Sequence, residues 1–376
     1  MRSALSLGRV LGIEIQLDYS WFIIFILIAW SLAVGYFPQG YPGWPPGLYW
    51  SLALLTSLLF FGSVLVHELA HSLVARRHGT PVRNIRLFIF GGVAQITEEP
   101  KSARDEFRFT IVGPLTSLGL GLAFGVIWWV SRGRDSTAPL AALAQWLSFV
   151  NFMLAGFNLI PGFPLDGGRI LRSLVWAVTN DLRRATRLAV TSGRIVAFLF
   201  ILAGVMLFFR GMWINGLWLA FIGWFLENAA AQSWRQFTLQ ELLQGHKVRE
   251  ILIPDSDWPQ VPPELPLQEL VEEHILTSFR RCLPVIEGGR FLGVVTVHKL
   301  REVPRDRWAT TRVAEVMIPF EQVKTIAPEA ELLNALRLMT QEDLNQLPVV
   351  SGGDLVGMLA RDKVLAFIQT RAELGL

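Results

Sequence analysis

The chain has one cysteine and little charge, and each shortage excludes a class of protein. A single thiol, Cys282, cannot close an internal disulfide and rules out a zinc site built from cysteines. Charged residues make up 17% of the 376 residues against 52% hydrophobic residues, a balance that favours a membrane protein. The net charge of +3 is small, so the composition indicates no nucleic-acid partner.

The hydrophobic residues are not spread evenly along the chain. Residues 1–230 hold nearly all of the long apolar runs, whereas 240–376 resemble an ordinary soluble α/β sequence. Fourteen Trp and twenty-five Phe suit helices that face lipid and the membrane interface. The first apolar run is long and lacks a small-residue cleavage pattern, so we expect it to remain as an anchor. These features predict a polytopic α-helical membrane protein followed by a soluble α/β part.

About six transmembrane helices are predicted from the apolar runs. They cover residues 19–37, 48–74, 107–130, 138–159, 195–209 and 213–230, of which the fifth is short for a full span. An even number of spans puts both termini on one side of the membrane. The segments on that side carry fifteen Lys and Arg against three on the other side, which places both termini in the cytoplasm. We expect a multi-pass protein of the plasma (inner) membrane or of an organelle membrane.

Two stretches of the apolar part alternate like β-strands. One covers residues 10–17, before the first span, and the other covers 84–90 and 93–96 with Gly91 and Gly92 as a tight turn between them. Lipid cannot satisfy a free strand edge, so these strands must lie at the membrane interface or against protein. The alternative is a peripheral cytoplasmic hairpin without a function.

The most informative motif is His-Glu-Leu-Ala-His at residues 67–71, inside an apolar run. Two His four residues apart lie on one face of a helix and can both bind Zn²⁺, while Glu68 between them can take a proton from zinc-activated water. Ionisable side chains at membrane depth are expensive and usually mark a functional site. The alternative is that His67 and His71 are satisfied by neighbouring side chains and bind nothing.

A catalytic zinc site normally has three protein ligands, and Asp166 is the candidate for the third. It follows Pro161 and Pro164, which break a helix, and it precedes two glycines that let the backbone approach another element. It is the only acid between Asp135 and Asp181. The alternative role for Asp166 is the N-cap of a helix that begins near residue 168.

These motifs resemble the site-2 protease family of intramembrane zinc metalloproteases. The resemblance covers roughly residues 7–230 and rests on HELAH on an early helix and FNLIPGFPLDGGR on a later one, with GIEIQLDYSW, FGG and VGPLTSL between or before them. It implies that His67, His71 and Asp166 bind one Zn²⁺ per chain and that Glu68 is the general base. It also implies that Asn158 orients the substrate or the developing oxyanion.

The resemblance further implies a membrane-anchored protein substrate that is cleaved in or near its transmembrane segment. A transmembrane helix hides its amides in internal hydrogen bonds, so the segment to be cut must unwind first. A strand edge at 93–97 can hold that segment by added-strand pairing. The predicted substrate-binding residues are Gly91, Gly92, Val93, Ala94 and Gln95.

The C-terminal part is an internal repeat. Residues 248–254 recur as 313–319, and similar short segments recur throughout at an offset of 64 or 65 residues. The pattern resembles a tandem of CBS domains, which sense adenine nucleotides. The predicted domains are therefore a protease domain at 1–231, a linker at 232–246 and a CBS pair at 247–376, with units at about 247–304 and 312–370.

The ligand of the CBS pair stays open. The family's usual ribose-binding Asp falls at Lys299 in the first unit and Lys363 in the second, and Asp362 is one position early. Adenine nucleotide binding, pairing of two protomers into a homodimer, and contact with substrate are the alternatives. A cytoplasmic CBS pair at this position is expected to modulate the protease.

A second class of function is compatible with the same residues. A transporter or channel regulated by CBS domains could coordinate an ion with an intramembrane His/Asp site, and transporters also use broken helices. Glu68 discriminates between the two, because hydrolysis needs a general base and ion transport does not.

Overall fold

The computed structural model describes residues 4–374, apart from 80, 81, 90, 97–99 and 101. The chain divides into two compact units, Met1–Trp234 and Arg235–Leu376. Helix α8 (Trp213–Leu243) contains the boundary, so most of the stretch 232–246, predicted as a linker, is helical.

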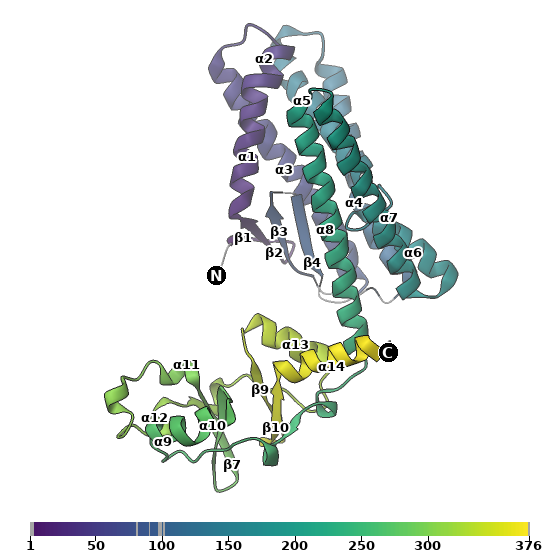
Figure 1. Cartoon of the computed structure of the whole chain (residues 1–376). Helices are drawn as coiled ribbons and strands as arrows, with labels where there is room; N and C mark the ends of the chain where they lie inside the picture. The colour runs from purple at the N-terminus through teal and green to yellow at the C-terminus, as the bar shows by residue number, and fades with distance from the viewer. Residues whose placement is uncertain (1–3, 80–81, 90, 97–99, 101, 375–376) are drawn as a thin grey trace. The chain divides into compact units, whose positions relative to one another are not determined.

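The first unit is mainly helical, and four strands lie near one end of its long helices (Figure 1). The strands are β1 (Ala4–Val10), β2 (Ile13–Asp18), β3 (Val82–Phe88) and β4 (Gly91–Ile96). The helices are α1 (Tyr19–Ser31), α2 (Phe37–Gly40), α3 (Pro46–Arg77), α4 (Ala103–Ser131), α5 (Ala138–Asn158), α6 (Asp166–Thr179), α7 (Leu182–Phe209) and α8.

Five helical segments are long and apolar enough to cross a membrane, which confirms the predicted fold class. They are Tyr19–Gly40, Pro46–Arg77, Ala103–Ser131, Asp135–Asn158 and Leu182–Phe209. The fifth was expected to be short, but the helix starts earlier in the chain because Asp181 caps it by accepting a hydrogen bond from the Arg184 amide. Helix α8 covers the sixth predicted span, and the total number of spans remains a prediction.

The four strands form one sheet in the order β1-β2-β3-β4. The stretch 10–17, predicted as a single strand, is instead the end of β1, a turn and most of β2. Leu11 and Gly12 form that turn with φ of 51° and 79°, so the chain reverses there. Gly91 and Gly92, predicted as the turn of the second hairpin, are instead the first residues of β4, and Ile89 after β3 is a turn residue.

The sheet packs through one face against the first helices. Alternate residues of β2 are buried, and Ile13, Ile15 and Ile85 form a core with Phe61 and Val64 of α3. Helix α3 also packs in parallel with α5: the ring centroids of Phe60 and Trp146 are 5.8 Å apart, and further along both helices Asn151 donates to Ser63 at 3.3 Å. The sheet and α5 therefore both lie against α3.

The second unit holds two similar halves. The first contains β5 (Ile253–Pro254), α9 (Leu267–Glu269), α10 (Leu276–Ser278), β6 (Cys282–Glu287), β7 (Arg290–Thr296) and α11 (Val297–Leu300). The second contains α12 (Val313–Val316), β8 (Ile318–Pro319), α13 (Leu332–Gln341), β9 (Gln346–Ser351), β10 (Asp354–Ala360) and α14 (Arg361–Leu374).

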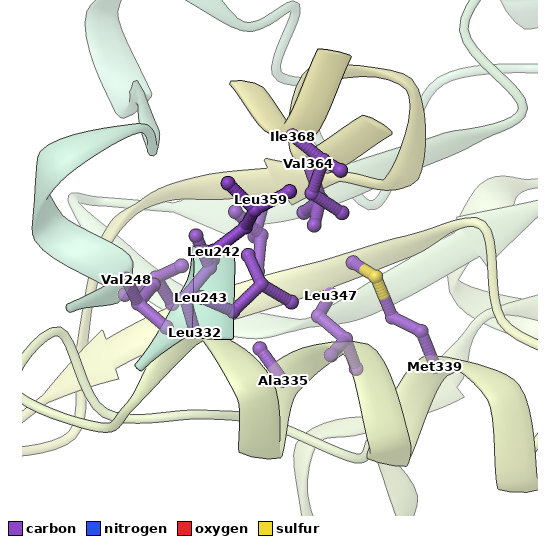
Figure 2. Packing of buried hydrophobic residues seen from close by; sticks show 11 residues of the cluster. Leu242, Leu243, Val248, Leu332, Ala335, Met339, Leu347, Leu359, Val364 and Ile368 are labelled. Atoms are coloured by element: carbon purple, nitrogen blue, oxygen red, sulfur yellow. The ribbon is translucent and has the colours of Figure 1, made fainter. Parts of the chain in front are cut away.

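The two halves exchange a short strand. β5 of the first half pairs with β10 of the second, and β8 of the second pairs with β7 of the first. Ile253 and Ile318 are equivalent positions of the repeat. Ile253 thereby lies in the sheet of the second half, and Ile318 lies in the sheet of the first half. Leu242 and Leu243, at the end of α8, complete the core around α13 and α14 together with Val248 and Leu332 (Figure 2). Each half therefore completes its sheet with a strand of the other half.

Candidate metal centre

Helix α3 carries three of the predicted site residues, His67, Glu68 and His71, within about one helical turn. His67 and His71 lie one turn apart on the same face, and their exposed fractions are 3% and 7%. Glu68 is half-buried beside them. The flanking sequence is apolar and helix-forming, so α3 holds these polar groups within the bundle.

The break predicted before Asp166 is present and delivers its carboxylate to the histidines. Helix α5 ends at Asn158, and α6 begins at Asp166 with Leu165 as its N-cap, so Asp166 is not the cap that one alternative proposed. Its Oδ2 lies 3.2 Å from Nε2 of His67 and 3.1 Å from Nε2 of His71, and the two Nε2 atoms are 3.2 Å apart. The structure thus brings together three residues from two segments ~100 residues apart in sequence.

The three donor atoms fit a zinc ion by geometry. Tetrahedral bonds of about 2.0–2.1 Å separate neighbouring ligand atoms by about 3.3–3.4 Å, close to the spacing of these three atoms. Two imidazole nitrogens and one carboxylate oxygen are also a usual catalytic donor set for zinc. The cluster is the one possible metal site found among the described residues.

Helix α4 leaves room for the ion. A Cβ on Gly113 would lie 2.0 Å from Nε2 of His71 and 2.8 Å from Nε2 of His67. Any larger residue at this position would therefore occupy the space next to both ligand nitrogens. Gly113 belongs to the VGPLTSL segment, and the sequence alone indicates no role for it.

The same helix fixes the orientation of both imidazole rings. The Phe109 carbonyl accepts from Nδ1 of His71 at 2.7 Å, and the Ser117 hydroxyl lies 2.8 Å from Nδ1 of His67. Because a carbonyl only accepts, Nδ1 of His71 must carry the proton, and its Nε2 is free to bind a metal. Sequence reasoning missed both partners: Ser117 shares a face of α4 with Gly113, but nothing in the sequence shows that this face meets the histidines.

The strand predicted to bind substrate lies over the catalytic helix. β4 is an edge strand of the sheet, and a Cβ on Gly92 would lie 2.5 Å from Cγ of Glu68. Val93, the next residue, is 48% exposed. The backbone at Ala94 and Gln95 belongs to β4, but their side chains, like residue 97 of the predicted edge, lie outside the described part. The absence of a side chain at Gly92 thus lets β4 approach Glu68 closely.

Comparisons with known proteins agree with this geometry. Peptidase family M50 matches residues 55–136 and 125–203, and the CBS domain family matches 248–306 and 313–370. Rip3 of Mycobacterium tuberculosis, named as a zinc metalloprotease, is 34% identical over 98% of this chain and 93% of its own length. The zinc metalloprotease sll0528 of Synechocystis is 33% identical over 99% and 97%.

A solved structure is also similar. The site-2 protease from Methanocaldococcus jannaschii is 30% identical, with a TM-score of 0.44, and the match covers 62% of this chain and 95% of that one.

Apolar helices that enclose a His-His-Asp site and a general-base candidate define a zinc metalloprotease of the membrane. The chain belongs to Peptidase family M50, and it is a zinc metalloendopeptidase of the site-2 protease type with a CBS domain pair. The expected family and the enzyme class are therefore confirmed.

Proposed function

We propose that this enzyme hydrolyses peptide bonds in or near transmembrane segments of membrane-anchored proteins. The observation that carries the proposal is the cluster of His67, His71 and Asp166, whose donor atoms lie 3.1–3.2 Å apart within a bundle of membrane-type helices. Zinc bound by these residues would polarise the scissile carbonyl and acidify water at the site. An ion transporter would have no use for Glu68 beside such a cluster.

Glu68 is the proposed general base. It lies on the same helical turn as the histidines, so it can accept the proton of the attacking water and return it to the leaving amine. The half-buried position keeps it reachable by water. We place the substrate segment on β4, because Gly92 of this strand lies beside Cγ of Glu68.

Asn158 is proposed to donate a hydrogen bond to the substrate or to the oxyanion. The contact between Asn151 and Ser63 sets the register of α5 against the parallel helix α3. Asn158 lies about 10 Å further along α5, while His67 and His71 lie about 6 and 12 Å beyond Ser63 along α3. Asn158 is therefore level with the catalytic turn.

The test of this function separates chemistry from metal binding. Glu68→Gln should abolish cleavage of co-expressed single-span substrates while the purified protein keeps one zinc per chain. Asp166→Ala should lose both the zinc, measured by elemental analysis, and the activity. Stoichiometric zinc in Asp166→Ala would exclude Asp166 as a ligand, and cleavage by Glu68→Gln would exclude the proposed base.

The role of β4 can be tested by cross-linking. A photoreactive amino acid at Val93 in the Glu68→Gln protein should cross-link a bound substrate, because the unwound segment adds to the edge strand. Leu122 on α4 is 62% exposed and lies about 13 Å along the helix from Gly113, so it serves as the control position away from the metal site. Equal cross-linking at both positions would contradict strand addition.

The active site is proposed to open toward the cytoplasm. His71 precedes the positively charged pair Arg76 and Arg77 at the end of α3, and the positive-inside rule places that end in the cytoplasm. The termini and the CBS pair are placed on the same side. A reporter that works only in the cytoplasm should be active when fused to the C-terminus. Activity of a fused reporter that works only outside the cytoplasm would overturn this orientation.

The CBS pair is proposed to regulate the protease, either by binding adenine nucleotide or by pairing two protomers. It contains a cavity of about 510 Å³ lined by residues that include Arg281, Thr296, His298 and Lys324. Lys299, at the position of the usual ribose-binding Asp, is paired instead with Glu302 at 2.8 Å. Nucleotide binding by the purified protein, and its mass in detergent, distinguish the two modes.

Removal of the CBS pair should change the rate or choice of cleavage but leave the zinc in place. The truncation should end near residue 234, because Leu242 and Leu243 are buried in the core of the second unit and would be exposed by a cut at 246. Loss of zinc from a folded truncated protein would make the CBS pair structural and contradict the regulatory role.

A further inference from the structure

A buried ion pair joins the helix that orients the histidines to the helix that supplies the third ligand. Nε of Arg172, on α6, donates to Oε1 of Glu106, on α4, at 2.7 Å, and Nη2 donates to the same oxygen. The exposed fractions of the two side chains are 4% and 0%. Arg169 adds a third charge, with its Nε 3.9 Å from that oxygen.

The residues around this pair are those that build the metal site. Glu106 lies one turn before Phe109, whose carbonyl orients His71. The guanidinium of Arg169 lies over the Phe109 ring, 5.3 Å from its centroid. The guanidinium of Arg172 lies over the Phe163 ring at 5.3 Å, in the segment that leads into Asp166. The pair thus holds both sides of the donor cluster.

We infer that Glu106 and Arg172 are positioning residues that keep the Asp166 carboxylate on the two histidines. A slip of α6 by a single residue would move Asp166 by about 1.5 Å and turn it by about 100°, out of reach of a shared metal. A charge pair with two hydrogen bonds on one oxygen has one good register, so it disfavours such a slip.

Packing stability is the competing explanation for the pair. A buried ion pair often contributes little net stability, although removal of one partner leaves an unpaired charge and is destabilising. The two explanations differ in what they expect of the folded protein. A positioning role lowers the zinc affinity of protein that is still folded, while a purely structural role lowers only the melting temperature.

The experiment uses the full-length protein in detergent, with zinc affinity measured by competition with a chromophoric chelator. The melting temperature of the zinc-free form is measured in parallel. Glu106→Gln, and Arg172→Lys as the milder second variant, should weaken zinc binding about 10- to 100-fold in folded protein, as loss of groups that orient metal ligands typically does. Arg194→Gln breaks the exposed pair with Glu227 (3.2 Å) and is the control, with unchanged affinity.

Because the inference rests on the proposed zinc ligands, Asp166→Ala is measured alongside. If Asp166→Ala keeps wild-type zinc affinity, the ligand assignment itself fails. If Asp166→Ala loses zinc but both pair variants bind it as the wild type does, only the positioning inference is overturned. Failure of both pair variants to fold would also overturn it, because the pair would then be needed for the fold as a whole.

Discussion

Substitution of Gly113 by alanine should weaken zinc binding by the enzyme without unfolding it. The added Cβ would lie 2.0 Å from Nε2 of His71 and 2.4 Å from its Cε1, whereas ordinary contact begins at 3.4 Å. The imidazole must therefore move by more than 1 Å, and a bond of about 2 Å to zinc does not survive such a shift. The methyl group also occupies the space beside Nε2 of His67.

The size of the effect follows from the number of ligands. Structural zinc sites bind with about 10–16 kcal/mol, so one ligand of four contributes roughly 2.5–4 kcal/mol, which corresponds to ~10²–10³-fold in affinity. Gly113→Ala should show this loss in the chelator competition assay, and its cleavage activity should fall with the bound zinc. The expected loss of zinc affinity does not depend on Glu68, because Glu68 is the proposed base and not a zinc ligand.

The same helix offers a matched control. Gly119 also lies in α4, and a Cβ there would meet nothing within 4 Å. Gly119→Ala should keep the zinc and the activity, and its melting temperature should be unchanged or higher because alanine favours the helix. If Gly113→Ala binds zinc as tightly as Gly119→Ala does, the metal does not occupy the space beside Gly113 and the site geometry given above is refuted.

Three further predictions concern single side chains. Asn158→Ala should keep its zinc but cleave ~10²–10³-fold more slowly, and unchanged rates would reduce Asn158 to a packing residue. Hydrogen bonds from Ser20 and pairing with Arg86 lower the pKa of Asp18 from 3.8 to about 2, so its stabilisation is complete above pH 3.8 and is lost between pH 3.8 and 2. Asp18→Ala should therefore lower the melting temperature at pH 7, because it removes a helix cap that contributes about 1 kcal/mol. The difference in melting temperature between wild type and variant should shrink toward pH 2. A difference that stays constant with pH would contradict the pKa argument. Burial raises the pKa of the Cys282 thiol to about 12, so alkylation at pH 8, followed by mass spectrometry, should be slow until the protein unfolds.

The sequence alone was sufficient for the parts of the site that depend on local spacing. Two His four residues apart must share a helix face, whatever surrounds the helix. Asp166 was identified because prolines and glycines interrupt the apolar run just before it, and the structure places it against both histidines. Composition likewise separated the membrane part from the soluble repeat, since apolar runs of this length have few other uses.

Other features depend on contacts between distant segments and could not be predicted. The roles of Gly113 and Phe109 follow from the position of α4 beside α3, and the residue spacing within α4 does not specify that position. The strand β1 and its turn were missed because Leu11 adopts a positive φ that its side chain does not favour.

The CBS repeat shows the same division between sequence and structure. The offset of 64 or 65 residues revealed two equivalent halves, but it did not show that Ile253 and Ile318 each pair with the sheet of the other half. A repeat specifies which elements exist, because helices and strands form from local patterns. Which elements pair is decided by the packing of the whole unit, and the charge pair between Glu106 and Arg172 is likewise visible only once α4 and α6 lie side by side.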